Sequence, residues 1–152
     1  MTGTLKTQWH PAFCAAFRLE LKEDLYALDC MNGFNLNSKP LQIDLLIIKK
    51  SQNVVTKNHL GRIFRGRNII EYKSPDDSMN VDTFIKVIGY ACLYKANEVL
   101  IDDIRLDDIT ITLVQEGYPE KLFRWFLEND FVITEKYQGI FYVAKHAKGL
   151  SH

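Results

Sequence analysis

Two apolar segments in the first half of the chain have the pattern of buried β-strands. Leu41–Lys49 contains the run Ile-Asp-Leu-Leu-Ile-Ile, and Arg62–Lys73 ends in Ile-Ile-Glu-Tyr-Lys. Both runs are apolar at odd and at even positions, which is typical of strands covered on both faces. The pattern predicts two central strands, the second in one or two pieces, with the polar stretch Ser51–Gly61 as a loop between them.

Three other segments have the spacing of amphipathic helices. His10 to about Leu28 repeats apolar residues at helical intervals and carries Pro11 in its first turn. Asn80–Asn97 has an apolar stripe, and Pro119–Asn129 is a shorter helix with Pro near its start. Between the first helix and the first central strand, Asp29–Lys39 is rich in turn residues and leaves room for a short strand.

The remaining strands come late in the chain. Ile109–Val114 is predicted as one strand, and Phe131–Glu135 and Ile140–Ala144 as a hairpin joined across Tyr137-Gln138-Gly139. The order of elements predicts an α/β fold, with a mixed central sheet flanked by helices and a C-terminal β-hairpin. A chain of 152 residues favours one domain, residues 1–152.

Composition narrows the class of protein. Hydrophobic residues are 47% of the chain and no apolar run approaches the length of a membrane span, so no membrane partner is expected. The N-terminus lacks the apolar core of a secretory signal. Three scattered cysteines, with no CxxC pair, support neither a zinc site nor a disulfide framework. A cytoplasmic location fits these features best.

The charges are balanced but unevenly distributed along the sequence. Nineteen basic and 19 acidic side chains give a net charge of zero, which argues against a nucleic-acid coat protein. Leu45–Ile70 nevertheless holds six Lys or Arg and no carboxylate, whereas residues 102–108 include four aspartates. Such an uneven distribution of charge can create a local positive field on a neutral protein. A solvated loop is the alternative reading. The candidate phosphate contacts are Lys49, Lys50, Arg62, Arg65 and Arg67.

Ionisable residues interrupt both central strands. Asp44 lies inside the first, and Glu71 and Lys73 share one face of the second because residues two apart point the same way. If the strands pair, Asp44 lies beside Glu71, and two neighbouring buried carboxylates need a cation. A hard divalent ion bound by oxygen ligands meets that need, with Lys73 adding a second positive charge. The alternative is a plain ion pair between Asp44 and Lys73.

Three stretches carry a family resemblance: WHPAFCAAFRLELKEDL, KPLQIDLLIIKK and GRIFRGRNIIEYKSPDDSMNVDTFIKVIGYACLYKA. They cover about the first two thirds of the chain. In order and motif they resemble the PD-(D/E)xK nuclease superfamily, which has the restriction-endonuclease-like fold. More specifically, they resemble bacterial PD-(D/E)xK family transposases, or recombination-promoting nucleases. One departure is that Pro40 stands four residues before Asp44 instead of next to it.

The resemblance implies a site. Asp44, Glu71 and the main-chain carbonyl of Tyr72 would ligate Mg²⁺, with Mn²⁺ as an alternative ion, and Lys73 would position or deprotonate the attacking water. Glu20 is expected as a fourth catalytic member, binding the metal directly or through water, because Glu20 follows Phe13 and Phe17 on one helical face. A pairing of Glu20 with Lys73 or another basic side chain is the alternative.

Other candidate residues have simpler interpretations. The spacing of His10 and the other histidines does not suggest a metal site, so surface positions are expected. On the helix after the second central strand, Tyr90 is expected in the core and Lys86 in solvent.

The favoured function is a Mg²⁺-dependent nuclease that hydrolyses DNA phosphodiester bonds, linked to mobile elements or recombination. DNA is the expected partner, and a homodimer is considered. The alternative is a catalytically weak or inactive nuclease-fold module that binds nucleic acid or protein. A third class is a scaffold in which Asp44, Glu71 and Lys73 form only an ion-pair cluster.

Overall fold

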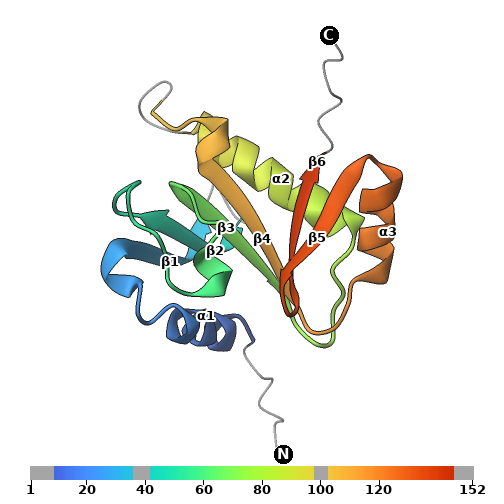
Figure 1. Ribbon diagram of the computed structural model, residues 1–152, viewed down its shortest axis with the longest axis horizontal. Helices are drawn as coiled ribbons and strands as arrows, with labels where there is room; N and C mark the ends of the chain where they lie inside the picture. The colour runs from blue at the N-terminus through green and yellow to red at the C-terminus, as the bar shows by residue number, and fades with distance from the viewer. Residues whose placement is uncertain (1–8, 36–41, 98–102, 146–152) are drawn as a thin grey trace, which may run out of the picture.

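The computed structural model describes residues 9–35, 42–97 and 103–145, and within them the chain forms three α-helices and six strands (Figure 1). A four-stranded sheet has the order β1-β2-β3-β4. β1 pairs with β2 and β2 with β3 antiparallel, whereas β3 pairs with β4 parallel. The bounds are α1 Trp9–Glu20, β1 Leu28–Asn35, β2 Gln42–Lys49, β3 Arg67–Lys73, α2 Val81–Ala96, β4 Ile109–Gln115, α3 Glu120–Glu128, β5 Phe131–Tyr137 and β6 Ile140–Lys145.

Helices α1 and α2 cover opposite faces of the four-stranded sheet (Figure 1). Because side chains alternate along a strand, each central strand supplies both faces. Leu45 and Ile70 pack in the cluster that contains Phe17 of α1. Leu46 and Ile69 pack in the cluster that contains Val87 of α2. The prediction of a mixed α/β fold with doubly covered central strands is confirmed.

Helix α2 connects the parallel pair β3 and β4 and is bounded as its sequence predicts. Asn80 precedes its first turn and accepts a hydrogen bond from the Thr83 N–H at 2.9 Å, which caps the helix. Asn97 is the C-cap. Among the described residues, no helix is long and apolar enough to cross a membrane.

The first helix is shorter than predicted, and the prediction that it extends to Leu28 is wrong. α1 ends at Glu20, and β1 begins at Leu28. Between α1 and β1, the buried carboxylate of Asp24 accepts hydrogen bonds from the main-chain N–H groups of Lys57 and Asn58, and these bonds hold the chain in a turn. Leu21 and Leu28 are buried, as the helical pattern suggested, but Leu21 lies in the turn after α1 and Leu28 in strand β1.

The strand after that turn is longer than predicted. β1 has eight residues, where only a short strand was expected in a turn-rich segment. Gly33 sits in it with a φ of 59°, a conformation that favours glycine. Residues 36–41, which include Pro40 and the predicted start of the first central strand, lie outside the described ranges.

A smaller unit follows β4. β5 and β6 form the predicted hairpin, and they pair with each other as a separate two-stranded sheet. Phe123 and Phe126 of α3 pack against Phe131 and Phe141 of the hairpin. Phe84 of α2 and Leu113 of β4 pack in the same cluster, so this unit shares its aromatic core with the rest of the chain (Figure 1).

Candidate functional site

The register of the central strands brings the two predicted carboxylates together. In the antiparallel pair of β2 and β3, Leu45 lies opposite Ile70, so Asp44 and Glu71 are the next residues along in that register. The Tyr72 N–H donates to Asp44 Oδ2 at 2.9 Å, which fixes the Asp44 carboxylate beside the Glu71–Tyr72 peptide. The prediction that these strands are adjacent is confirmed.

Glu71 is a buried carboxylate with one oxygen unused. It is 4% exposed, and its Oε1 accepts a hydrogen bond from Lys86 Nζ at 2.8 Å. Its Oε2 has no hydrogen-bond partner among the described residues. Burial raises the pKa of Glu71, the hydrogen bond from Lys86 opposes that rise, and the charge of Asp44 adds to it. Burial of the Glu71 carboxylate therefore outweighs the contacts that stabilise its ionised form.

Lys86 reaches this carboxylate from α2. Its side chain is 41% exposed, so the aliphatic stem follows the surface while the ammonium turns inward to Glu71. Burial lowers the pKa of Lys86, but the hydrogen bond and charge of Glu71 outweigh it and raise the pKa overall. The expectation that Lys86 faces only solvent is wrong. Tyr90, one turn further, is buried as expected, with its ring centroid 5.5 Å from Lys86 Nζ.

His10 approaches Asp44 from the opposite helix. His10 Nε2 lies 3.4 Å from Asp44 Oδ1, although the His10 side chain is 64% exposed. Below it, Phe13 stacks on Tyr72 with ring centroids 4.4 Å apart, and Cys14 Sγ lies 3.7 Å from the Asp44 carbonyl oxygen. The sequence interpretation of His10 as an ordinary surface residue missed this contact. A usable signal was the helical spacing that puts His10 on the face of Phe13 and Cys14.

Lys73 is held at the edge of the site. Its Nζ lies 3.1 Å from Asp77 Oδ2, in the turn that follows β3. The hydrogen bond from Lys73, together with the Ser78 N–H, lowers the pKa of Asp77. Lys73 is near enough for its charge to act on Glu71. Among the described residues Lys73 pairs with Asp77 and forms no ion pair with Asp44, so the alternative of a direct Asp44–Lys73 pair is wrong.

Glu20 lies away from these residues, and the expectation that its side chain points into the core is wrong. Glu20 is exposed, while Leu21 continues the buried stripe of Cys14 and Phe17. Asp44 meets α1 at His10, and ten residues of helix put Glu20 about 15 Å further along the axis. The Glu20 carbonyl accepts a hydrogen bond from Asn58 at 2.6 Å, and the residue borders a hollow beside the β5–β6 hairpin.

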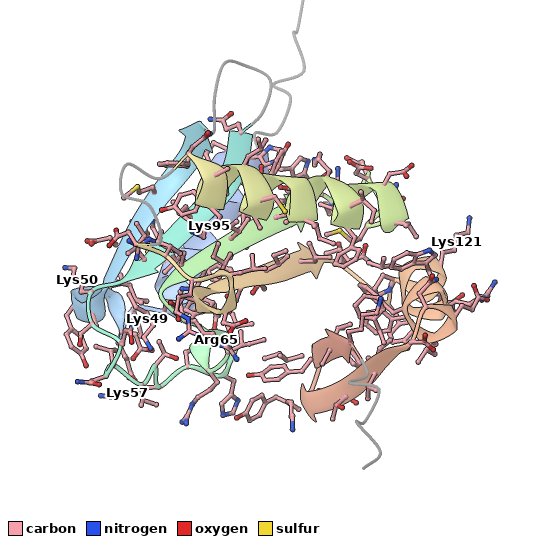
Figure 2. All side chains as sticks on the ribbon, turned by 90° about the horizontal axis from the view of Figure 1, so that it is seen from above. Lys49, Lys50, Lys57, Arg65, Lys95 and Lys121 are labelled. Atoms are coloured by element: carbon pink, nitrogen blue, oxygen red, sulfur yellow. The ribbon has the colours of Figure 1, made fainter. Side chains whose placement is uncertain are left out.

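The predicted phosphate contacts lie at the other end of the central strands. β2 ends at Lys49 and the antiparallel β3 begins at Arg67, whereas Asp44 and Glu71 occupy the opposite ends. Five residues of strand separate Asp44 from Lys49 by about 17 Å. Figure 2 shows Lys49, Lys50, Lys57 and Arg65 on one side of the molecule.

The basic segment also meets acidic residues that are distant in sequence. Because β3 and β4 are parallel neighbours, the loops that precede them lie side by side. The Arg65 guanidinium donates to the Asp107 carbonyl, and Lys50 lies 3.7 Å from Asp29. The Lys50–Asp29 contact pairs opposite charges, whereas Arg65 bonds to a main-chain oxygen. Asp102 lies outside the described residues, and the role of the basic residues in binding DNA stays a prediction.

The metal-binding capacity of the site is limited to few side chains. Across residues 9–35, 42–97 and 103–145, no group of three or more His, Cys, Asp or Glu is arranged to hold a metal ion. What the geometry offers is two carboxylates, from Asp44 and Glu71, at neighbouring strand positions. Comparison of the chain with protein-family models, with curated proteins and with solved structures gives no match.

Proposed function

We propose that this chain is a Mg²⁺-dependent nuclease of the PD-(D/E)xK type that hydrolyses DNA phosphodiester bonds. The observation that carries the proposal is the pair Asp44 and Glu71 on adjacent strands, with the buried Oε2 of Glu71 lacking a hydrogen-bond partner in the part of the chain that the structure describes. A buried acceptor without a donor is costly, and such groups concentrate at functional sites.

These residues fit a hard divalent cation. The free Oε2 of Glu71 and the carboxylate of Asp44 are oxygen ligands of the kind that Mg²⁺ prefers, and the main-chain carbonyl of Tyr72 is a third candidate. A bound Mg²⁺ would lower the pKa of a coordinated water and neutralise charge that develops on the phosphate. Burial raises the pKa of Glu71 by more than the hydrogen bond from Lys86 lowers it, and a cation at the site would favour the ionised carboxylate.

The surrounding residues have distinct positioning roles. The Tyr72 N–H orients the Asp44 carboxylate, and the stacked rings of Phe13 and Tyr72 keep water from that side. Lys73 supplies an ammonium that orients the attacking water, and Asp77 holds that ammonium in place.

The order of elements supports the finer fold assignment. Helix, strand with Asp44, strand with Glu71 and Lys73, and then helix is the order that the resemblance implies, and the described chain has it as α1, β2, β3 and α2. The unit formed by α3, β5 and β6 carries no motif of the family. A link to mobile elements or recombination depends on the resemblance alone.

A nuclease-fold module without useful turnover is the second candidate. Two observations favour it: no group of three or more His, Cys, Asp or Glu in the described part of the chain is arranged to hold a metal ion, and Lys49 and Arg67 lie at the far strand ends. Such a module would bind nucleic acid or protein and leave DNA intact.

The test is cleavage of labelled single- and double-stranded DNA by the purified protein in Mg²⁺, in Mn²⁺ and in excess chelator. We expect cleavage that depends on the divalent ion and that Asp44→Asn abolishes. Asp29→Asn is the matched control, because Asp29 is an exposed aspartate on the neighbouring strand β1. Intact DNA in every condition, with DNA binding retained, selects the non-catalytic module.

A further inference from the structure

Lys86 and Glu71 form a contact that joins a half-exposed side chain to a buried one. Lys86 Nζ lies 2.8 Å from Glu71 Oε1, and Glu71 is 4% exposed. The Lys86 side chain is 41% exposed on α2. The two partners therefore differ in how freely each can move.

Glu71 is fixed by its strand. β3 lies between β2 and β4 in the sheet, and Glu71 is paired in register with Leu113 of β4. Lys86 has a flexible four-carbon stem with a route to solvent. If the contact opens, Lys86 is the partner that leaves.

The charges at the site disfavour the presence of the Lys86 ammonium and a divalent cation at the same time. Asp44 and Glu71 carry two negative charges, and the charge of Asp44 acts on Lys86 as well as on Glu71. Lys86 supplies one positive charge at Oε1, while Oε2 of the same carboxylate has no hydrogen-bond partner within the described ranges. A divalent ion at Oε2 would stand within a few ångströms of the ammonium, where like charges repel.

We infer that Lys86 is the built-in counter-ion of the site, which neutralises Glu71 in the metal-free chain and is displaced when a divalent cation binds. The inference rests on the proposed function, because it requires the Asp44–Glu71 pair to bind a metal. Lys73 has a different place, since its ammonium is held by Asp77 beside the site. Lys86 thus stabilises the empty site and lowers its affinity for the cation.

The experiment compares cation binding by the wild type and by Lys86→Met, which keeps the apolar stem and removes the charge. Binding of MnCl₂ and MgCl₂ is measured by titration calorimetry on the full chain. We expect Lys86→Met to bind Mn²⁺ about tenfold more tightly, which is the scale of one partly exposed hydrogen bond to a charged group. Its melting temperature should fall in chelator and rise more than that of the wild type on adding Mn²⁺.

Two further variants serve as controls. Lys86→Arg keeps the positive charge and should bind Mn²⁺ like the wild type, within about threefold. Lys95→Met makes the same substitution on the same helix, nine residues and about 13 Å along its axis, and should leave the affinity unchanged.

The outcomes separate this inference from the proposed function. Wild type and Lys86→Met binding Mn²⁺ equally, or weaker binding by Lys86→Met, overturns the counter-ion role and leaves the metal site standing. Binding by Lys86→Met alone supports the inference in its strongest form. Absence of binding by both proteins overturns the inference and the metal-dependent function together.

Discussion

Replacing Glu71 with Gln tests whether this carboxylate serves the site or the fold. Gln has the same shape but no charge, and Lys86 can turn into solvent because its side chain is 41% exposed. The change removes a buried carboxylate whose Oε2 meets no hydrogen-bond partner among the residues that the structure describes, and such a group costs roughly 1–3 kcal/mol. Because Lys86 already offsets part of this cost, we expect Glu71→Gln to stabilise the metal-free chain by about 1 kcal/mol. For a domain of this size that is about 2–4 °C in melting temperature.

The advantage of Gln should depend on pH. Burial raises the pKa of Glu71 above its ordinary value near 4.5. The contribution of Glu71 to the stability of the folded chain is therefore fully present below the pKa that this carboxyl has in the unfolded chain. That contribution is lost as the pH rises through the raised pKa of Glu71 in the folded chain. Gln resembles the protonated carboxyl at every pH. The difference between Glu71→Gln and wild type should be small near pH 4.5 and should grow toward pH 8.

The assay is thermal and urea unfolding of both proteins in chelator at pH 4.5 and pH 8, and then with Mn²⁺ at pH 8. Glu71→Gln should be the more stable protein in chelator and should lose the stabilisation by Mn²⁺. A loss of several kcal/mol in chelator would refute this reasoning. Breaking a structural buried ion pair costs roughly 3–5 kcal/mol, so a large loss would make Glu71 and Lys86 a scaffold element.

Three further predictions concern the remaining candidate residues. Lys73→Ala should abolish cleavage while Mn²⁺ binding by calorimetry changes little, because a protonated lysine cannot be a metal ligand; undiminished cleavage contradicts the role given to Lys73. Glu20→Gln should leave both Mn²⁺-induced stabilisation and cleavage unchanged, because Glu20 is exposed at the end of α1; a clear loss of either would restore it to the site. Reversing the charges of Lys49 and Lys50 should weaken DNA binding and flatten its salt dependence, with the single-turnover cleavage rate unchanged; an unchanged salt slope makes them solvated residues.

Strong local patterns made the central part of the fold predictable from the sequence. The runs around Ile43–Ile48 and Ile69–Ile70 are apolar at odd and at even positions, which is typical of strands covered on both faces. Pairing of those strands then places Asp44 and Glu71 together. The end of α1 was not predictable in the same way, since Leu21, Leu25 and Leu28 keep the helical period through a turn and into a strand.

The candidate site was predictable only where it lies on strands. Spacing could have placed His10 on the sheet-facing side of α1, but Lys86 reaches the site through side-chain length, which spacing does not reveal. Lys86 is on the exposed side of α2, yet its long stem brings the ammonium to Glu71. Glu20 occupies a position next to the buried stripe, and one residue along a helix turns a side chain by about 100°. The meeting of Arg65 with Asp107 required knowing that β3 and β4 are parallel neighbours.

The central claim is that Asp44 and Glu71 bind one divalent cation between them. The most direct measurement is anomalous diffraction from crystals of the protein grown with and without MnCl₂. We predict an anomalous peak within about 2.0–2.6 Å of an oxygen from each carboxylate, with Lys86 Nζ withdrawn from Glu71 Oε1. Crystals grown with saturating Mn²⁺ that show no peak there, with the Lys86–Glu71 contact intact, would contradict the account.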